Sequence, residues 1–290
     1  MSVTALIVTY NRLEKLKKTL GATLLLPFKS IVIVNNASND GTTEWLAKLT
    51  DDRIVVINSD VNDGGAGGFF RGAEWLSKYC NAEWILFYDD DAYPESNLLE
   101  KFILVDNDKI DVITTNVVST DHLRCKMNIP WVKIPSTVFE VFSSLINNEK
   151  FIAQDTYNER IVTFSFVGTF IRTQVVKESF YKIRKDLFIY FDDVYYAWSL
   201  HLMKRIMWHY PSLTFYHDVP HTNVVMPPWK VYYLTRNLLW GRKYFKTKPP
   251  FSNLSIILRL IKYSSLVFKS DNKREYMKNI MRGICDGLFN

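Results

Sequence analysis

The run WILFYDDD, residues 84–91, gives the clearest indication of the fold. Its five apolar residues are typical of a strand buried within a sheet, and Asp89, Asp90 and Asp91 follow where such a strand leaves the sheet. Ligands bind just outside the carboxyl ends of strands in open α/β sheets. Adjacent carboxylates repel one another unless a cation lies among them, and Mg²⁺ is commonly held by carboxylates together with substrate phosphates. The stretch therefore predicts a parallel sheet, a metal and a phosphorylated ligand, with a solvated acidic loop as the alternative.

Apolar runs and helical patterns alternate on both sides of this stretch. Strands that are apolar throughout and separated by helices indicate an α/β fold, in which helices cover both faces of a mostly parallel, open sheet. The expected strands are Val3–Val8, Ser30–Val34, Ile54–Ile57, Trp84–Tyr88 and Asp111–Val117, and the expected helices are Arg12–Leu25, Thr43–Leu49, Phe69–Tyr79 and one from Pro94 to about Val105.

The pattern weakens over residues 122–160, where apolar and polar residues mix without a firm period. We expect this segment to be an insertion that covers the carboxyl edge of the sheet. A strand is expected again over Ile161–Arg172, then a helix over Asp192–Met207 and a strand over Leu213–Tyr216. Residues 220–228 are typical of a hinge. The chain is therefore expected to divide into residues 1–225, with halves 1–120 and 121–225, and a helical tail of residues 226–290.

Composition excludes several classes of protein. The 290 residues are 48% hydrophobic, which is enough for one large domain with an appendage. We expect no membrane span, because the best candidate, Leu254–Phe268, contains Arg259 and Lys262. Three scattered cysteines form neither a disulfide framework nor a zinc site. The chain enters an apolar strand at Val3 without a basic start or a cleavage site, so we expect no signal peptide and a cytoplasmic location.

Positive charge is concentrated in the tail. Trp229–Asn290 holds 13 Lys and Arg against three acidic residues, although the whole chain carries a net charge of only +6. Aromatic residues are interspersed with these bases, a mixture that is typical of a helix lying on an anionic membrane. The alternative is a helical cap that packs on the rest of the chain and has a solvated basic face. Nucleic-acid binding fits the charge, but no motif supports it, so we expect no nucleic-acid partner.

Polar residues at the ends of two other expected strands are candidate ligand contacts. Thr9-Tyr10-Asn11 follows the first strand, and Asn35-Asn36 begins a turn-rich run after the second. Ordinary capping and turn formation would also explain both runs.

A glycine cluster, Gly64–Gly68, follows the third expected strand and is followed by Arg71. Glycines let the backbone approach a ligand closely, helix N-termini attract phosphates, and Arg71 offers a positive partner. The cluster is not the dinucleotide-binding fingerprint, because its glycine spacing differs and it does not follow the first strand. A purely structural glycine loop is the alternative.

A second pair of acids, Asp192-Asp193, stands at an expected helix start among aromatic residues. One carboxylate can cap the helix while the other acts as a base, and apolar surroundings would raise the pKa of a carboxyl toward a useful value. His217 ends the last expected strand and is a candidate metal ligand through its neutral imidazole. His221 is its rival, and a structural hydrogen bond is the alternative role.

Taken in this order, the motifs resemble those of the family 2 glycosyltransferases of the GT-A fold, over about residues 1–225. The glycine cluster, Arg71 and the three aspartates are most similar to those of bacterial galactofuranosyltransferases, with rhamnosyltransferases as close neighbours. The resemblance makes residues 1–225 a catalytic domain, with a nucleotide-sugar half and an acceptor half. It implies that Thr9, Tyr10, Asn11, Asn35, Asn36, Gly67, Gly68, Arg71, Asp89 and Asp90 bind the donor, that Asp91, Asp89 and His217 hold Mn²⁺ or Mg²⁺, that Asp193 is the catalytic base, and that Asp192, Tyr195 and Gly168 contact the acceptor.

Two positions depart from the family pattern. Asn35 and Asn36 stand where many members have an aspartate that contacts the base, which leaves uridine and thymidine both open. Tyr195 stands where many members have another acid, so the acceptor side is expected to differ.

The expected protein is an inverting, metal-dependent glycosyltransferase. It would move galactofuranose from UDP-galactofuranose to a lipid-linked bacterial surface polysaccharide, such as an O-antigen or a capsule, at the inner face of the cell membrane. The alternative is a rhamnosyltransferase that uses dTDP-rhamnose. A non-catalytic protein that binds sugar nucleotides or glycans is less favoured, because a binding protein has no need of the second acid pair.

Overall fold

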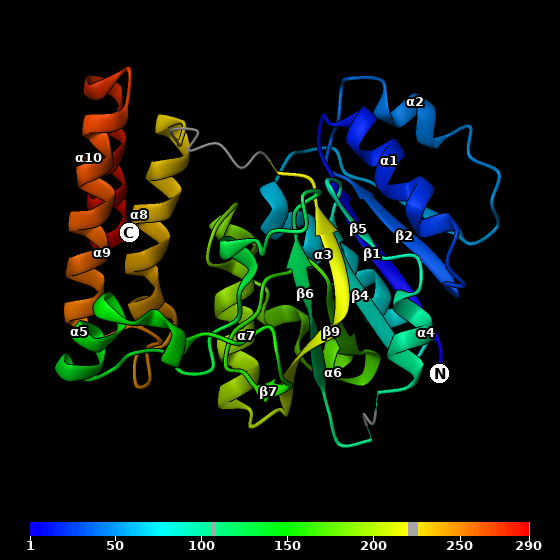
Figure 1. Ribbon diagram of the computed structural model, residues 1–290. Coiled ribbons are helices and arrows are strands. Elements are labelled where there is room, and N and C mark those ends of the chain that lie inside the picture. The colour runs from blue at the N-terminus through cyan, green and yellow to red at the C-terminus, as the bar shows by residue number, and fades with distance from the viewer. Residues whose placement is uncertain (106–107, 220–225, 290) are drawn as a thin grey trace.

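The fold is built around one mixed β-sheet with helices on both faces, and the C-terminal helices stand beside it (Figure 1). The computed structural model describes residues 1–105, 108–219 and 226–289. The strands are β1 (Val3–Thr9), β2 (Ser30–Asn35), β3 (Ile54–Asn58), β4 (Trp84–Asp89), β5 (Ala92–Pro94), β6 (Val112–Val118), β7 (Glu159–Arg160), β8 (Thr169–Arg172) and β9 (Met207–His217). The α-helices are α1 (Leu13–Leu24), α2 (Thr42–Leu46), α3 (Gly64–Tyr79), α4 (Leu98–Ile103), α5 (Val138–Ile146), α6 (Thr173–Ser179), α7 (Asp192–Leu202), α8 (Pro228–Tyr244), α9 (Asn253–Ser265) and α10 (Lys273–Phe289).

The strand order β3-β2-β1-β4-β8-β6-β9-β5 places the carboxyl ends of four parallel strands at one edge of the sheet. In this register Val8 pairs with Asp89, and Thr9 pairs with Asn35. The motifs that follow β1, β2 and β4 are therefore neighbours in space. β8 runs antiparallel to β4 and β6. The α/β prediction of a mostly parallel open sheet flanked by helices is confirmed.

The second half of the chain departs from the sequence-based expectation at several places. The helix expected from Pro94 is preceded by the short strand β5, in which Ala92 pairs with His217. α7 ends at Leu202 instead of continuing to Met207, because the chain turns through a left-handed Lys204 and enters β9. β9 begins at Met207 because its residues alternate between buried and half-buried positions, as a strand requires. Only the last part of the strand expected over Ile161–Arg172 pairs in the sheet, as β8. The expected hinge lies largely, and His221 wholly, outside the described residues.

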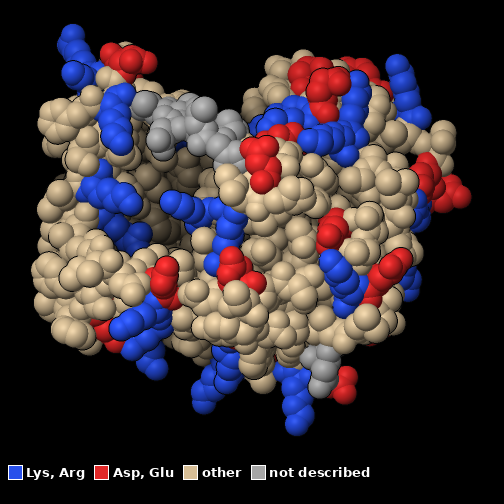
Figure 2. All heavy atoms as spheres, in the orientation of Figure 1, with Lys and Arg blue, Asp and Glu red and all other residues tan. Residues whose placement is uncertain are grey.

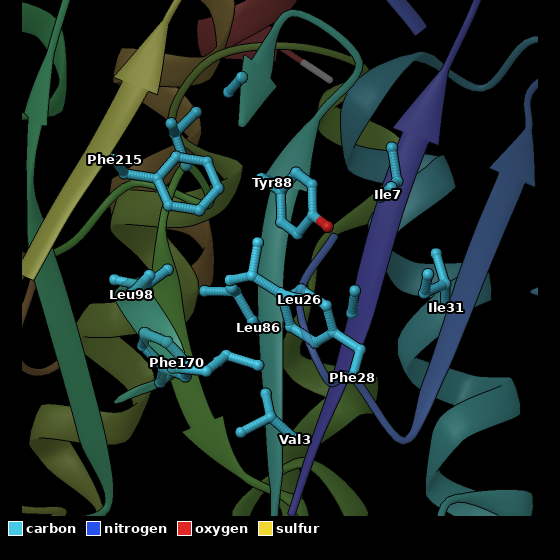
Figure 3. Packing of buried hydrophobic residues seen from close by; sticks show 14 of the residues in the cluster. Val3, Ile7, Leu26, Phe28, Ile31, Leu86, Tyr88, Leu98, Phe170 and Phe215 are labelled. Atoms are coloured by element: carbon cyan, nitrogen blue, oxygen red, sulfur yellow. The ribbon is translucent and has the colours of Figure 1, made fainter. Parts of the chain in front are cut away.

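Aromatic and aliphatic side chains fill the space between the sheet and its covering helices (Figure 3). Tyr88 and Phe215 meet edge to face at 5.1 Å, and Phe102 stacks on Phe170 at 3.9 Å. Such pairs contribute about 0.5–1.5 kcal/mol beyond the burial of their area. This packing fixes the end of β4 against β8 and β9, and so fixes the place from which the three aspartates project.

The sequence analysis expected the helix to begin at Phe69, after the glycine cluster. In the structure the cluster itself forms the first turn of α3. A methyl group added to Gly68 would lie 2.4 Å from Val8 Cγ1, and one added to Gly72 would lie 2.3 Å from Leu6 Cδ1. Real side chains do not approach so closely, so these glycines let α3 lie directly on β1. Gly64 has a φ of +70°, which favours glycine.

The tail is three helices that pack on the rest of the chain. α8 lies against α10, and Val231 and Leu238 of α8 are buried in one apolar cluster with Leu187 and Tyr195. None of the helices in the described parts of the chain is both long and apolar enough to cross a bilayer.

We predict that Gly68→Ala lowers the free energy of unfolding by about 1–3 kcal/mol, because overpacking would push α3 away from β1. Gly65→Ala is the matched control, because nothing lies within 4 Å of the added methyl group. This control should leave stability unchanged or raise it by up to about 1 kcal/mol, the helix preference for alanine over glycine. Urea unfolding of both variants checks the prediction, and equal stabilities would refute the close-packing role of Gly68.

Candidate functional site

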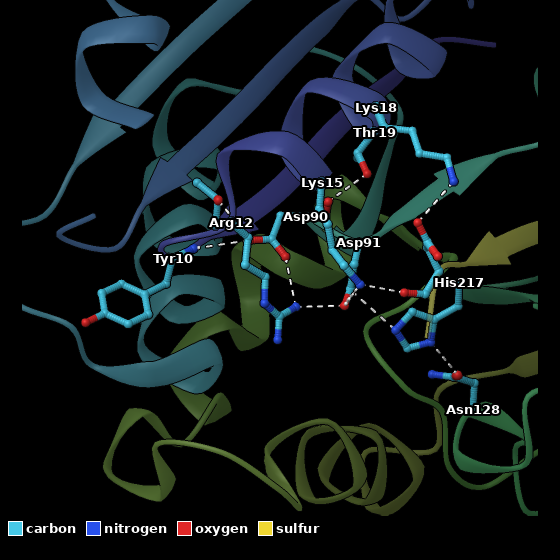
Figure 4. Close-up of polar contacts among 11 residues, drawn as sticks. Tyr10, Arg12, Lys15, Lys18, Thr19, Asp90, Asp91, Asn128 and His217 are labelled. Carbon is cyan, nitrogen blue, oxygen red and sulfur yellow. Dashed lines mark hydrogen bonds and ion pairs between the residues drawn. The ribbon is translucent and has the colours of Figure 1, made fainter. Parts of the chain in front are cut away.

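Asp90 and Asp91 lie at the end of β4 and share a cation from α1 (Figure 4). Arg12 donates from Nη1 to Asp90 Oδ1 at 3.1 Å and to Asp91 Oδ2 at 2.7 Å. Thr9 donates from Oγ1 to Asp90 Oδ2 at 2.9 Å, and Lys15 Nζ lies 3.6 Å from Asp91 Oδ2. Both carboxylates are buried. The site is therefore an acid cluster with basic side chains along one side.

His217 meets this cluster from the end of β9. Its Nε2 lies 3.3 Å from Asp91 Oδ1, and its Nδ1 lies 3.0 Å from Oδ1 of the buried Asn128. Asn128 in turn donates from Nδ2 to Ser165 Oγ at 3.0 Å, so its Oδ1 is left to accept from the histidine. This bond requires a proton on Nδ1, so Nε2 either carries a second proton and donates to Asp91 or presents its lone pair to a metal.

The three aspartates differ in proton affinity. Burial, followed by the charges of Asp91 and Asp90, raises the pKa of Asp89 to about 8. Burial also raises the pKa of Asp90 to about 6, against the opposing charge of Arg12. Burial would raise the pKa of Asp91 too, but the bond and charge of His217, with the charges of Arg12 and Lys15, hold it at about 2. The cluster therefore carries more acid than its neighbours neutralise, and an added cation would stabilise it.

The donor types present fit a hard divalent cation. Carboxylate oxygens are suitable ligands for Mn²⁺ and Mg²⁺, and Asp91 Oδ1 faces His217 while Arg12 holds the other oxygen. In the described ranges, however, no three side chains of metal-binding type are already gathered around one point. Asp91 and His217 are the two that meet, and the half-buried Asp89 stands two residues before Asp91.

Asp192 and Asp193 open α7 after a strained turn. Phe188, Tyr190 and Phe191 have φ values of 67°, 69° and 66°. Aromatic residues rarely adopt this left-handed conformation, which costs of order 1–3 kcal/mol each. Burial raises the pKa of Asp192 and of Asp193. The charge of Asp193 raises the pKa of Asp192 further, so the pair is arranged to hold one proton.

An asparagine of α8 holds the strained turn in place. Asn237 is fully buried and donates from Nδ2 to the carbonyl oxygens of Leu187, Ile189 and Tyr190 at 3.0, 2.8 and 3.0 Å. Its neighbour Arg236 donates from Nη2 to Leu187 O at 3.0 Å. The tail thereby fixes the residues from which α7 and its two acids begin.

The turn also touches the donor side of the sheet. Phe188 O accepts a hydrogen bond from Ala66 N at the start of α3, at 3.2 Å. A hydrogen bond from the backbone N–H of Phe166 lowers the pKa of Asp193 and so opposes the effect of burial. The Phe166 ring stacks on Phe87 of β4, with 5.4 Å between the ring centroids. Phe87 stands two residues before Asp89. The two acid groups, Asp89–Asp91 and Asp192-Asp193, are thus attached to one aromatic core at the carboxyl edge of the sheet.

A family model described as glycosyl transferase family 2 matches residues 4–180. The chain belongs to this family.

Individual relatives agree with the family at low identity. Over 203 residues, or 69% of this chain and 46% of the relative, the chain is 24% identical to a poly-beta-1,6-N-acetyl-D-glucosamine synthase of Staphylococcus aureus. The chain thus spans about half the length of the curated relatives it matches.

Two solved structures show the same fold. One is S. aureus TarS 1-349 in complex with UDP-GlcNAc, with a TM-score of 0.56, 13% identity and coverage of 98% of this chain and 82% of that one. The other is the mannosyltransferase PcManGT from Pyrobaculum calidifontis in complex with GDP-Man and Mn²⁺, with a TM-score of 0.56, 14% identity and coverage of 99% and 87%. The fold is therefore the GT-A fold.

Among the residues after β1 and β2 that were expected to bind the donor, some are exposed and others are buried or bonded within the protein. Tyr10 is 41% exposed and its ring points away from the acids, so it is free to contact a ligand (Figure 4). Thr9 is buried, and its hydroxyl already donates a hydrogen bond to Asp90. Asn11 accepts from Asn39 N at 2.8 Å and joins two turns. That Thr9 and Asn11 contact the donor stays a prediction.

The asparagines after β2 already have internal partners. Asn35 donates from Nδ2 to Thr43 Oγ1 at 2.8 Å and to Asn58 Oδ1 at 2.9 Å, and it is 2% exposed. Asn36 donates from Nδ2 to Gly64 O at 2.8 Å and is 1% exposed. Both side chains hold turns together in this structure, and that Asn35 and Asn36 bind the donor stays a prediction.

Other expected contacts also have internal partners. Arg71 donates from Nη2 to Asp63 Oδ2 at 2.8 Å, which reduces its value as a free phosphate partner. A methyl group on Gly67 would lie 2.1 Å from Asp63 Cβ, so this glycine has a packing role of its own. Whether Arg71, Gly67 and Gly68 touch the donor stays a prediction.

Two residues expected to contact the acceptor, Tyr195 and Gly168, lie in the core, and their contact with an acceptor stays a prediction. Tyr195 is fully buried, and its hydroxyl donates to Asn237 O at 2.7 Å, so it joins α7 to the tail. Gly168 is buried, donates from its N–H to Phe87 O at 2.9 Å and accepts from Thr115 N at 3.1 Å. Its φ of +71° explains the glycine as a backbone requirement. Asp192 is buried at the start of α7, and its contact with an acceptor stays a prediction.

The sequence analysis missed the basic residues of the site. Arg12 and Lys15 lie one helical turn apart at the start of α1, directly after Thr9-Tyr10-Asn11, and this spacing was the available signal. Lys230 of α8 is a third basic residue, and its pKa depends on the charges of Arg12 and Asp91. Its pKa is lowered, first by burial and then by the charge of Arg12, while Asp91 acts in the opposite direction. Nothing local in the sequence connects Lys230 to Asp91.

We predict that Asn237→Ala lowers the free energy of unfolding by about 1–3 kcal/mol, because the carbonyls of Ile189 and Tyr190 lose this donor and Leu187 O loses one of its donors. Transferase kcat should fall on the order of tenfold or more, because Asp193 loses its fixed position. The KM for the donor should change little. Circular dichroism melting and steady-state kinetics, at a temperature where the variant is folded, check both effects.

Asn279→Ala is the matched control, because Asn279 lies in the same tail and bonds only within α10, to Glu275. It should leave kcat unchanged. A folded Asn237→Ala protein with the kcat of the wild type would contradict the positioning role.

Proposed function

We propose that the protein is an inverting glycosyltransferase that uses a nucleotide-activated sugar. The observation that supports this best is the pairing of two acid groups, Asp89–Asp91 and Asp192-Asp193, on one aromatic core at the carboxyl edge of the sheet, with Asp90, Asp91 and Asp192 buried and the other two half-buried. A binding protein needs at most the first group. The family and the GT-A fold provide the context in which this pairing becomes a reaction centre.

The diphosphate of the donor would lie beside Arg12, Lys15 and Lys230. Arg12 and Lys15, at the start of α1, contact Asp91, and the pKa of Lys230 in the tail responds to the charges of Arg12 and Asp91. Arg presents several N–H donors in a fixed plane, and Lys is a mobile point charge, so the set suits a group with many oxygens. Tyr10, which is exposed beside Asp90, is placed to stack on the base.

Asp91, His217 and Asp89 would hold Mn²⁺ or Mg²⁺ together with the donor phosphates. Such an ion, when bound, neutralises the charge that develops on a leaving diphosphate. Arg12 and Lys15 add to that neutralisation from the protein's own side chains.

Asp193 would act as the base. Its carboxylate removes the proton from an acceptor hydroxyl while that oxygen attacks the anomeric carbon of the donor. A bond forms between the acceptor oxygen and the sugar, and the bond from the sugar to the diphosphate breaks on the opposite face, which inverts the configuration. Asp192, whose pKa is raised by burial and by the charge of Asp193, stays protonated and leaves the negative charge on its neighbour.

The proposed donor is UDP-galactofuranose, because Gly64–Gly68, Arg71 and the three aspartates are most similar to those of galactofuranosyltransferases. dTDP-rhamnose is the second candidate. The proposed acceptor is a lipid-linked bacterial surface polysaccharide, reached at the inner face of the cell membrane through the basic tail. The product would be a surface glycan such as an O-antigen or a capsule.

The direct experiment is a donor panel with Mn²⁺ that contains UDP-galactofuranose, dTDP-rhamnose, UDP-GlcNAc and GDP-mannose. Release of the nucleoside diphosphate is scored with and without glycan acceptors. We expect turnover of UDP-galactofuranose and its loss on chelation of the metal. Hydrolysis of none of the donors would count against an enzyme.

We predict that Asp193→Asn lowers kcat by about 10²–10⁴-fold, the usual contribution of a general base, while donor binding stays intact. In the wild type, kcat/KM should fall as the pH drops through the raised pKa of Asp193, well above the usual aspartate value of about 3.9, because the protonated carboxyl cannot accept a proton.

Asp52→Asn is the matched control, because Asp52 is exposed on a turn of the chain before β3. It should leave both kcat and the pH profile unchanged. Full turnover by Asp193→Asn, with donor affinity equal to that of the wild type, would refute the assignment of the base.

A further inference from the structure

Helix α5 turns its apolar side to the solvent. Within it, Val141 is the buried apolar residue, at 4% exposure. Its other large apolar side chains are strongly exposed: Val138 (63%), Phe139 (82%), Phe142 (51%), Leu145 (65%) and Ile146 (89%).

The exposed residues form one continuous face. They follow the spacing of three and four residues that places side chains on one side of a helix. Glu140, Ser143 and Ser144 occupy the opposite side and are half-buried. A surface helix of a globular protein normally has the reverse arrangement, with its apolar side facing the core.

α5 is firmly built and is not a frayed segment. Thr137 Oγ1 accepts from Glu140 N at 3.2 Å, and Glu140 Oε2 accepts from Thr137 N at 3.2 Å, which completes a capping box. Lys133 forms an ion pair with Glu140. The sequence therefore maintains a stable helix in order to present its apolar side outward.

A second helix extends this apolar surface. α5 lies beside α9 (Figure 1), which exposes Ile257 (53%) and Ile261 (60%) one turn apart. Phe268, in the 3₁₀ turn Leu266–Lys269 after α9, is 79% exposed. Contiguous exposed apolar surface of this kind marks an interaction site.

The charge on α9 and the turn after it is of one sign. Residues 253–269 contain Arg259, Lys262 and Lys269 and no acidic residue, and Lys262 and Lys269 are exposed. Figure 2 shows a largely uncharged area where α5 and the start of α9 lie at the lower left, with basic side chains above it and both basic and acidic side chains below it. Apolar side chains bordered by bases are complementary to an anionic lipid surface, where headgroups meet the bases and acyl chains meet the apolar residues.

We propose that α5, α9 and Phe268 form a docking surface for an anionic lipid bilayer, with α5 as the element that enters it. α5 lies in the plane of the interface and buries its apolar side among the headgroups and upper acyl chains. Lys262 and Lys269 contact the lipid phosphates. This proposal rests on the proposed function in one respect, because a lipid-linked acceptor would be presented at the same bilayer.

The test is cosedimentation of the full chain with vesicles of phosphatidylglycerol and phosphatidylcholine in equal parts, and with vesicles of phosphatidylcholine alone. The inserting side is removed by Phe139→Ser with Phe142→Ser and Ile146→Ser. Charge is reversed by Lys262→Glu with Lys269→Glu. The matched control is Leu25→Ser with Leu104→Ser, which removes two apolar side chains that are 82% and 85% exposed outside the proposed surface.

The wild type and the control should bind the anionic vesicles alike. The α5 variant should bind at least tenfold more weakly, and the charge variant should lose its preference for anionic over neutral vesicles. Circular dichroism melting should be unchanged, because every altered side chain is exposed. Equal binding by the α5 variant and the wild type, or no vesicle binding by the wild type at low salt, would overturn the proposal.

A wild type that is dimeric in solution, with a monomeric α5 variant, would also overturn it and make the surface a contact between copies. Release of nucleoside diphosphate without vesicles separates this test from the proposed function. The α5 variant should retain that release, whereas an absence of release in every protein would refute the proposed function and leave the vesicle result to decide the docking surface.

Discussion

The catalytic geometry depends on how one buried asparagine holds a strained turn. Phe188, Tyr190 and Phe191 adopt left-handed conformations that aromatic residues avoid, and Asn237 donates to three carbonyls of this turn. The cost of the strain is repaid by these bonds and by the burial of the aromatic rings. Since α7 begins directly after the turn, the position of Asp193 is set by the tail helix α8. The tail is therefore a structural part of the site.

The turn also connects the two sides of the reaction centre. Phe188 O binds the start of α3, and Phe166, whose N–H acts on Asp193, stacks on Phe87 of β4. A shift of the turn would move Asp193, the proposed base, relative to Asp89–Asp91. Lys230, on the same helix as Asn237, has a pKa that responds to the charges of Arg12 and Asp91. One helix thus contributes to the position of the proposed base and to the charge around the proposed donor site.

Sequence predicted the first half of the fold because its signals are local. Apolar runs marked β1, β2, β3 and β4, and the polar residues at their ends come together because parallel strands end at one edge. The paired strands β5 and β9 were missed or shortened because pairing partners lie more than 100 residues apart. Asp91 and His217 were brought together as expected. The places of Lys230 and Asn237 depend on tertiary packing, which no local pattern reports.

We propose that one edge of the sheet holds both the donor diphosphate and the base. A crystal structure with UDP and Mn²⁺ tests it most directly, because Mn²⁺ is located by its anomalous scattering. The account predicts the ion beside Asp91 and His217, the diphosphate beside Arg12 and Lys230, and Asp193 open to the space next to the terminal phosphate. Nucleotide bound away from Asp89–Asp91, or Asp193 closed off from the bound diphosphate, would contradict it.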